Sequence, residues 1–188
     1  MSGIAAVFFD RDGTINEEAG YIGSLRDLHI YPNAVEAVRM VNDAGMKAVV
    51  ITNQSGVARG LIEEDFLSEI HGQIRDHLAK QGAVIDGFYY CPHHPTAGSE
   101  PYRQQCSCRK PEPGMLIRAA EDHGIDLSIS YVIGDHASDI QAAKRVSAKG
   151  ILVKTGHGLE HLNGDAEPDY TAEDVLDAVR WIIRDRLK

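Results

Sequence analysis

Apolar residues follow two patterns along the chain. Short apolar runs without polar alternation are typical of strands buried on both faces. Such runs occupy residues 5–9, 47–52, 88–90, 131–133 and 151–153. Elsewhere, apolar residues recurring every three or four positions predict amphipathic helices. These helices are expected at residues 33–44, 63–81, 114–123 and 138–146, with a last one after a cap-like segment at 171–174.

Strands that alternate with helices in this way predict an α/β fold in three layers. The expected core is a Rossmann-like, mostly parallel sheet with helices on both faces. The length of 188 residues suits one domain spanning residues 1–188. The segments 14–33 and 91–108 are too short to form a large cap domain. We therefore expect an open site whose loops select the substrate.

Composition and charge argue against several classes of function. The formal net charge of −9 disfavours a nucleic-acid-binding surface. No apolar run approaches the ~20 residues that span a bilayer, and the N-terminus lacks the basic start and apolar stretch of a signal peptide. We expect a cytoplasmic protein without nucleic-acid or membrane partners. Nothing in the sequence requires a protein partner, so a monomer is expected.

Polar groups follow three of the predicted strands at the point where each strand ends. Asp10 follows the first strand, Thr52 ends the second and Asp135 follows the fourth. In open α/β sheets, ligands bind beyond the carboxyl ends of the strands. Asp12 lies two residues after Asp10 and so can face the same side. Each residue alone has an ordinary explanation, such as a solvated turn or a strand end, but their convergence on one edge favours a site.

The order of these motifs resembles the haloacid dehalogenase superfamily. The matching residues are Asp10-Arg11-Asp12-Gly13-Thr14, Thr52, Lys110 and Gly134-Asp135 with Asp139. Within that superfamily, the chain resembles most closely the D-glycero-D-manno-heptose-1,7-bisphosphate 7-phosphatases, with histidinol-phosphatases as near relatives. The stretches that carry this resemblance are residues 9–16, 52–60, 90–95 and 106–111.

The resemblance implies a HAD-like fold and a phosphatase that depends on Mg²⁺. In this reading Asp10 attacks phosphorus and forms an aspartyl-phosphate. Asp12 is the acid and base, Thr52 donates a hydrogen bond to the phosphoryl group and Lys110 stabilises its charge. The metal is expected on the side chains of Asp10 and Asp135 and the backbone carbonyl of Asp12.

One further residue completes the expected catalytic apparatus. Asp139 is implied to act indirectly, by orienting Lys110. A divalent cation and a lysine are needed because the phosphate dianion repels the attacking carboxylate. Two like unit charges at ~4 Å repel by roughly 4 kcal/mol at an effective dielectric constant near 20.

A second constellation pairs Cys91-x-His93 with Cys106-x-Cys108. Three cysteines and one histidine form a known structural zinc set. The pairs are spaced more tightly than the usual C-x₂-C, and from spacing alone free thiols or a disulfide remain open. His94 is a rival ligand to His93, and the resemblance favours His93. Because Arg109 and Lys110 directly follow Cys108, zinc is expected to orient these cations towards the site.

The resemblance also nominates positions that bind substrate. At one of these positions this sequence departs from the family. The nominated residues are Glu18, Gly20, Tyr21, Asn53, Gln54, Ser55, Arg109 and His136. Arg109 suits a second phosphate because its guanidinium binds phosphate in a bidentate manner. At His136 the family commonly has lysine.

The leading hypothesis is removal of the 7-phosphate of a heptose 1,7-bisphosphate, a small phosphorylated sugar used in the synthesis of lipopolysaccharide or a related glycan. The alternatives are hydrolysis of histidinol phosphate or another small phosphate ester, and a zinc-stabilised binding module without catalysis.

Overall fold

A computed structural model describes residues 3–161 and 166–187. Its centre is a six-stranded sheet in the order β3-β2-β1-β4-β5-β6, in which every neighbouring pair is parallel. The strands are β1 (Ala6–Phe9), β2 (Lys47–Asn53), β3 (Gly87–Cys91), β4 (Tyr131–Gly134), β5 (Lys149–Val153) and β6 (Tyr170–Ala172). The predicted parallel α/β sheet is confirmed.

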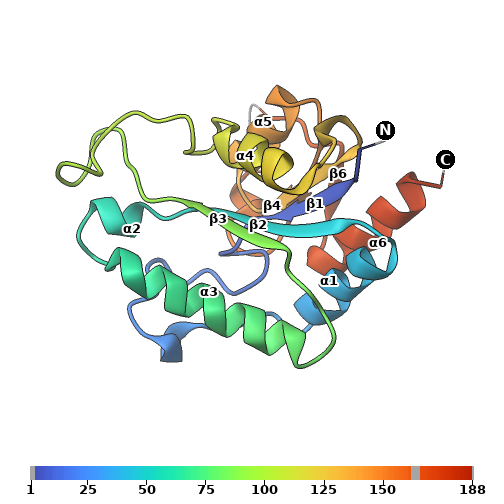
Figure 1. Cartoon of the computed structure of the whole chain (residues 1–188), viewed down its shortest axis with the longest axis horizontal. Helices are drawn as coiled ribbons and strands as arrows, with labels where there is room; N and C mark the ends of the chain where they lie inside the picture. Colours follow the sequence, from blue (N-terminus) through green and yellow to red (C-terminus); the bar gives the residue numbers. More distant parts are fainter. Residues whose placement is uncertain (1–2, 162–165, 188) are drawn as a thin grey trace.

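Helices cover both faces of this sheet. In Figure 1, α4 and α5 lie above the sheet, and α1, α3 and α6 lie below it. The helices are α1 (Ala34–Asp43), α2 (Ser55–Ala58), α3 (Glu64–Ala79), α4 (Gly114–His123), α5 (Ala137–Arg145) and α6 (Val175–Asp185). Three short 3₁₀ turns span Leu25–Asp27, Leu127–Ile129 and Gly158–His161. The described helices include none with the length and apolar character needed to cross a membrane.

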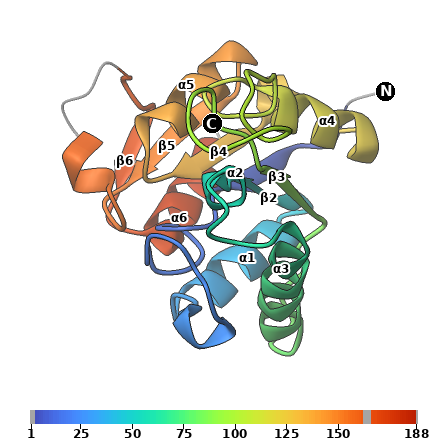
Figure 2. The same cartoon turned by 90° about the vertical axis from the view of Figure 1, so that its left-hand side faces the viewer.

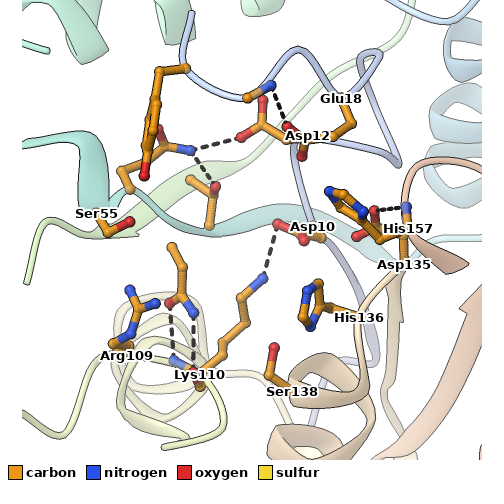
Figure 3. A pocket seen from close by; sticks show the side chains of 15 residues that line it. Asp10, Asp12, Glu18, Ser55, Arg109, Lys110, Asp135, His136, Ser138 and His157 are labelled. Carbon is orange, nitrogen blue, oxygen red and sulfur yellow. Dashed lines mark hydrogen bonds and ion pairs between the residues drawn. The ribbon is translucent and has the colours of Figure 1, made fainter. Parts of the chain in front are cut away.

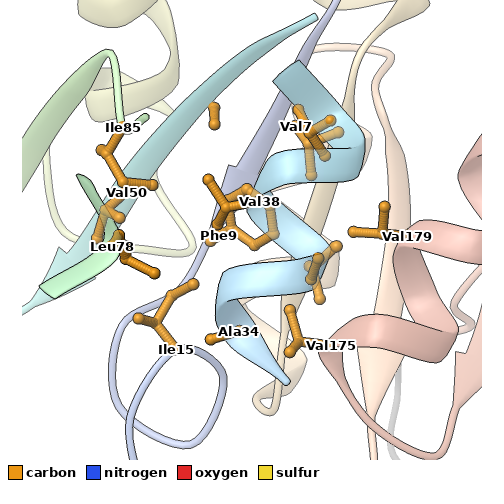
Figure 4. Packing of buried hydrophobic residues seen from close by; sticks show 14 of the residues in the cluster. Val7, Phe9, Ile15, Ala34, Val38, Val50, Leu78, Ile85, Val175 and Val179 are labelled. Atoms are coloured by element: carbon orange, nitrogen blue, oxygen red, sulfur yellow. The ribbon is translucent and has the colours of Figure 1, made fainter. Parts of the chain in front are cut away.

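The layers explain why the strands lack polar alternation. Val7 and Phe9 of β1 point into the core shared with α1, α3 and α6, whereas Ala6 and Phe8 point into the core under α4 and α5. Figure 4 shows Val7 and Phe9 packed beside Val38 of α1. Both faces of β1 are fully buried, so every residue of the run is apolar.

Two elements differ from the sequence prediction. Residues 170–172 form the edge strand β6, although the segment 171–174 was expected as a cap. The cap itself is Asp174, whose side chain accepts hydrogen bonds from the amides of Leu176 and Asp177. The second element is the short helix α2, since no helix was expected at residues 55–58.

The carboxyl ends of the strands form one edge, which faces the viewer in Figure 2. The loop between β3 and α4 extends beyond this edge, and the short helix α2 follows β2 there. In the part of the chain that the structure describes, residues 14–33 and 92–113 contain no helix or strand apart from the turn Leu25–Asp27. As predicted, no large cap domain covers the edge.

Candidate active site

A pocket of about 500 Å³ opens at the carboxyl edge of the sheet (Figure 3). It is lined by Asp10, Asp12, Glu18, Gly20, Tyr21, Thr52, Asn53, Gln54, Ser55, Arg109, Lys110, Asp135, His136, Ser138 and His157. Every residue that the sequence nominated for catalysis or substrate binding is in this set. Asp139 lies behind the pocket and is fully buried.

Asp10 stands where β1 meets the pocket. Its backbone amide still bonds to the Ile133 carbonyl of β4 at 2.8 Å, and its Oδ1 accepts the Arg11 amide at 2.7 Å. Its carboxylate is therefore held by the strand register rather than by a mobile loop. Burial raises the pKa of Asp10 well above its ordinary value, although Lys110 opposes this effect.

Lys110 forms a buried ion-pair network at the base of the pocket. Its Nζ lies 2.9 Å from Asp10 Oδ1 and 2.6 Å from Asp139 Oδ1. Burial acts to lower the pKa of Lys110, but these two carboxylates raise it above its ordinary value. Lys110 is therefore a permanent cation beside Asp10.

Asp12 lies across the pocket from Lys110 and is surrounded by donors. Its Oδ2 is 2.8 Å from Arg11 Nη2, and Asn16 and Gln54 also donate to the carboxylate. Burial acts to raise the pKa of Asp12, but the Arg11 guanidinium and these hydrogen bonds hold it below the ordinary value. Thr52 is the penultimate residue of β2 and accepts a hydrogen bond from Gln54 at 2.8 Å.

Asp135 follows β4 and is fixed by the loop after β5. The backbone amide of His157 donates to Asp135 Oδ2 at 2.8 Å. A Cβ atom on Gly13 or on Gly156 would lie 2.1 Å from this oxygen, so both positions require glycine. Burial raises the pKa of Asp135 to about 6, despite the His157 hydrogen bond.

Two residues of the pocket, Ser138 and His157, were not predicted from the sequence. His157 lies between two glycines just beyond the fifth strand, at the same sheet edge as Asp10 and Asp135, and this position was the available signal. Ser138 lies in the first turn of α5 and has no distinctive sequence signal.

The nominated substrate-binding residues form the pocket walls. Arg109 Nη1 donates to the His93 carbonyl at 3.1 Å, and Glu18 Oε1 accepts the Gly20 amide at 2.6 Å. His136 is exposed, and its ring lies 4.0 Å from the ring of His161. Figure 3 shows Arg109 and His136 on either side of Lys110.

The three cysteines and His93 cluster beside this wall. Cys108 Sγ lies 2.8 Å from Cys91 Sγ, 3.4 Å from Cys106 Sγ and 3.4 Å from His93 Nδ1. Hydrogen bonding with Cys91, Cys106 and His93 lowers the pKa of the Cys108 thiol to about 5 against the effect of burial. All three cysteines are free thiols.

The rival ligand His94 faces away from this cluster. Its Nδ1 accepts the amides of Thr96 and Ala97, at 3.2 and 2.8 Å.

The acidic groups at the pocket base suit a divalent cation. Asp10, Asp135 and Asp139 each offer an oxygen within 4.8 Å of the others. Lys110 supplies one positive charge against these three carboxylates. Carboxylate oxygens are the ligands that Mg²⁺ prefers in proteins, so this donor set fits Mg²⁺.

Comparisons with known proteins agree with this geometry. The HAD-hydrolase-like family matches residues 107–178. The chain is 44% identical over 185 residues to a D-glycero-D-manno-heptose-1,7-bisphosphate 7-phosphatase of Thermosynechococcus vestitus, covering 94% of each chain. It is 42% identical over 167 residues to a D-glycero-beta-D-manno-heptose-1,7-bisphosphate 7-phosphatase of Photorhabdus laumondii, covering 88% of this chain and 87% of the relative.

The chain belongs to the heptose-1,7-bisphosphate 7-phosphatase family of the haloacid dehalogenase superfamily. As a member of this phosphatase family it is a phosphoric monoester hydrolase. A solved relative is the D,D-heptose 1,7-bisphosphate phosphatase of B. bronchiseptica, complexed with magnesium and phosphate. That structure superposes with a TM-score of 0.86 at 32% identity, covering 97% of this chain and 99% of the relative. Mg²⁺ is thus the cofactor expected of this family.

Proposed function

We propose that this heptose-bisphosphatase family member removes the 7-phosphate of D-glycero-D-manno-heptose 1,7-bisphosphate through an aspartyl-phosphate on Asp10. The observation that carries the proposal is the contact between Lys110 Nζ and Asp10 Oδ1 at 2.9 Å, inside a pocket that also holds Asp12, Thr52 and Asp135. The substrate named for its relatives supplies the sugar. The product would enter the assembly of a surface glycan such as lipopolysaccharide.

Asp10 is the proposed nucleophile. Its Oδ1 has hydrogen-bond and ion-pair partners, and its Oδ2 is the oxygen proposed to attack. Oδ1 accepts from the Arg11 amide and faces Lys110. Attack by Oδ2 on phosphorus forms a P–O bond to Asp10 and breaks the P–O bond to the sugar. The sugar leaves with the electron pair as an alkoxide and takes up a proton.

Lys110 and Thr52 are proposed to bind the phosphoryl oxygens. Lys110 is a fixed buried cation, so it stabilises charge without reorganising during the reaction. The Thr52 hydroxyl accepts from Gln54, which leaves its own hydrogen free to donate. Asp12 carries a proton in the substrate complex, gives it to the leaving alkoxide and regains one from the water that hydrolyses the intermediate.

Mg²⁺ is proposed to bind the side chains of Asp10 and Asp135 and the backbone carbonyl of Asp12. When bound, it offsets the negative charge that the carboxylates and the phosphate bring together. His157, Gly13 and Gly156 keep the Asp135 carboxylate in place for this role. Asp139 acts on Lys110 instead, through their 2.6 Å ion pair.

Zn²⁺ is proposed to bind Cys91, His93, Cys106 and Cys108. The four ligand atoms lie within 4.8 Å of one another, and the set matches a known structural zinc composition. The His93 carbonyl holds Arg109, so zinc would orient the residue proposed to bind the second phosphate. The chain is further proposed to act as a monomer and a single domain in the cytoplasm.

A panel of phosphate esters tests this function. The panel contains both anomers of heptose 1,7-bisphosphate, the heptose 7-phosphate, histidinol phosphate and a hexose 6-phosphate, each with Mg²⁺. We expect the highest kcat/KM with one heptose 1,7-bisphosphate anomer. A higher value with histidinol phosphate would assign the chain to that reaction instead, and no phosphate release from any ester would overturn the enzymatic proposal.

A further inference from the structure

The carboxylate of Asp12 is held by three neighbouring side chains, Arg11, Asn16 and Gln54, which together form the Asp12 cradle. Asp12 Oδ1 accepts from Arg11 Nη2 at 2.9 Å, Arg11 Nε at 3.2 Å and Asn16 Nδ2 at 2.9 Å. Asp12 Oδ2 accepts from Arg11 Nη2 and Gln54 Nε2, both at 2.8 Å. Both oxygens are thus fixed from several directions.

The cradle is itself rigid. Arg11, Asn16 and Gln54 are 1%, 0% and 5% exposed. Asn16 Nδ2 also donates to the Glu17 carbonyl at 2.9 Å, and the amides of Ile15 and Asn16 return to the Arg11 carbonyl. A buried, internally bonded turn therefore sets the direction of the Asp12 carboxylate before any substrate binds.

Gln54 connects this carboxylate to a second group of the site. One side-chain nitrogen, Nε2, lies 2.8 Å from Asp12 Oδ2 and 2.8 Å from Thr52 Oγ1. With its two N–H groups, Gln54 can hold both acceptors at once. The positions of Asp12 and of the Thr52 hydroxyl are then coupled through one amide.

We propose that Arg11, Asn16 and Gln54 are positioning residues that aim the Asp12 carboxylate at the leaving-group oxygen, with Gln54 also aligning Thr52. This inference rests on the proposed function. It gives Gln54 a role through Asp12 and Thr52, where the sequence resemblance nominated it as a substrate contact. Arg11 had no predicted role.

A merely structural role of these residues predicts a different outcome. Loss of folded protein lowers the rates of all substrates by the same factor. Misplacement of Asp12 instead slows reactions that need a proton on the leaving group. An alkyl phosphate releases a strongly basic alkoxide and needs this proton, whereas 4-nitrophenyl phosphate releases a stable anion without it.

The test uses single-turnover rates of Gln54→Met with Mg²⁺ on an alkyl phosphate that the wild type hydrolyses and on 4-nitrophenyl phosphate. Methionine has a similar size but no donor. General acid catalysis contributes about 10²–10⁴-fold, so we expect the alkyl ester to lose at least about tenfold more rate than the aryl ester. Arg11→Lys keeps the positive charge but loses the forked pair of guanidinium donors. It should also lose more rate on the alkyl ester than on the aryl ester.

Three reference variants calibrate this measurement. Asp12→Asn should show the full bias, and Thr52→Val should slow both esters by similar factors. Gln73→Met, at an exposed position of α3, should leave both rates unchanged. Equal losses on both esters in Gln54→Met and Arg11→Lys would overturn the inference while the proposed function stands. A wild type that releases phosphate from no alkyl phosphate, the heptose bisphosphate included, would overturn the proposed function and this inference with it.

Discussion

The side-chain amide of Asn53 forms a pair of hydrogen bonds with the backbone of Lys110. Asn53 Oδ1 accepts the Lys110 amide at 3.0 Å, and Asn53 Nδ2 donates to the Lys110 carbonyl at 3.1 Å. Asn53 ends β2, whereas Lys110 lies in the long loop before α4. The pair therefore ties the loop that carries the catalytic cation to the rigid edge of the sheet.

Replacing Asn53 with leucine should lower kcat by more than its cost in stability can explain. A displacement of about 1 Å at a catalytic group can cost ~10²-fold in rate, whereas two lost hydrogen bonds at a half-buried position cost about 1–3 kcal/mol. We expect kcat to fall between tenfold and a hundredfold on the heptose bisphosphate. An unchanged kcat in a folded Asn53→Leu variant would contradict the role of this pair.

Arg109→Ala should impair a bisphosphate more than a monophosphate. Hydrogen bonds to charged groups contribute about 1.5–3 kcal/mol, so kcat/KM for the bisphosphate should fall by about ten- to a hundredfold. The heptose 7-phosphate lacks the second phosphate and should lose much less. Arg103→Ala is a matched control because Arg103 lies in the same loop with an exposed side chain. Equal losses on both substrates would argue against contact between Arg109 and the second phosphate.

His93→Ala and His94→Ala form a matched pair for the zinc site. His93 Nδ1 lies 3.4 Å from Cys108 Sγ, whereas His94 Nδ1 caps two backbone amides. Mass spectrometry of the purified proteins should find zinc in His94→Ala and a clear loss in His93→Ala. The opposite result would make His94 the ligand.

Removal of zinc should also weaken the enzyme in excess Mg²⁺. The His93 carbonyl orients Arg109, so the KM for the heptose bisphosphate should rise after chelation and dialysis. Restoring zinc should reverse the change. Unchanged kinetics of the zinc-free protein would show that zinc has no effect on substrate binding.

His71 should make the protein less stable in acid. It is buried against Phe88 with a ring distance of 4.9 Å, and burial lowers its pKa to about 3, with the Arg11 cation adding to the effect. The unfolded chain binds the proton with a pKa near 6.5, so stability falls as pH drops from about 6.5 towards 3. This residue alone should lower the free energy of unfolding by about 2 kcal/mol between pH 7 and pH 5.

Urea unfolding at both pH values measures this effect. His71→Phe keeps the ring and removes the titration, so its free energy of unfolding should fall less with acid than that of the wild type. His77→Phe, at an exposed position of the same helix, should keep the wild-type dependence. A wild-type slope in His71→Phe would show that His71 does not control acid stability.

The sequence predicted most of the sheet because burial on both faces leaves a strong signal. The run Ala5–Phe9 is apolar at each position, and β1 lies at the centre of the sheet between two cores. The edge strand β6 has only three residues, two of them half-buried, so no comparable signal exists. The four-residue helix α2 is set by its place after β2 rather than by an apolar stripe.

The candidate site was predictable where residues follow strands. Asp10, Thr52 and Asp135 all end or follow central strands, and the parallel topology brings them together. The hydrogen-bond partners of these residues were harder to predict from the sequence. That Gln54 bonds to Asp12, and that the His157 amide reaches Asp135, depends on loop conformations that residue types alone do not specify.

In the proposed reaction, Asp10 attacks the 7-phosphate and leaves the anomeric phosphate in place. Phosphorus NMR of heptose 1,7-bisphosphate with enzyme and Mg²⁺ tests this claim directly, with Asp10→Asn as the inactive control. We expect loss of the 7-phosphate signal, growth of inorganic phosphate and a retained 1-phosphate signal, with no reaction in the variant. Loss of the 1-phosphate first, or turnover by Asp10→Asn at the wild-type rate, would contradict the proposed reaction.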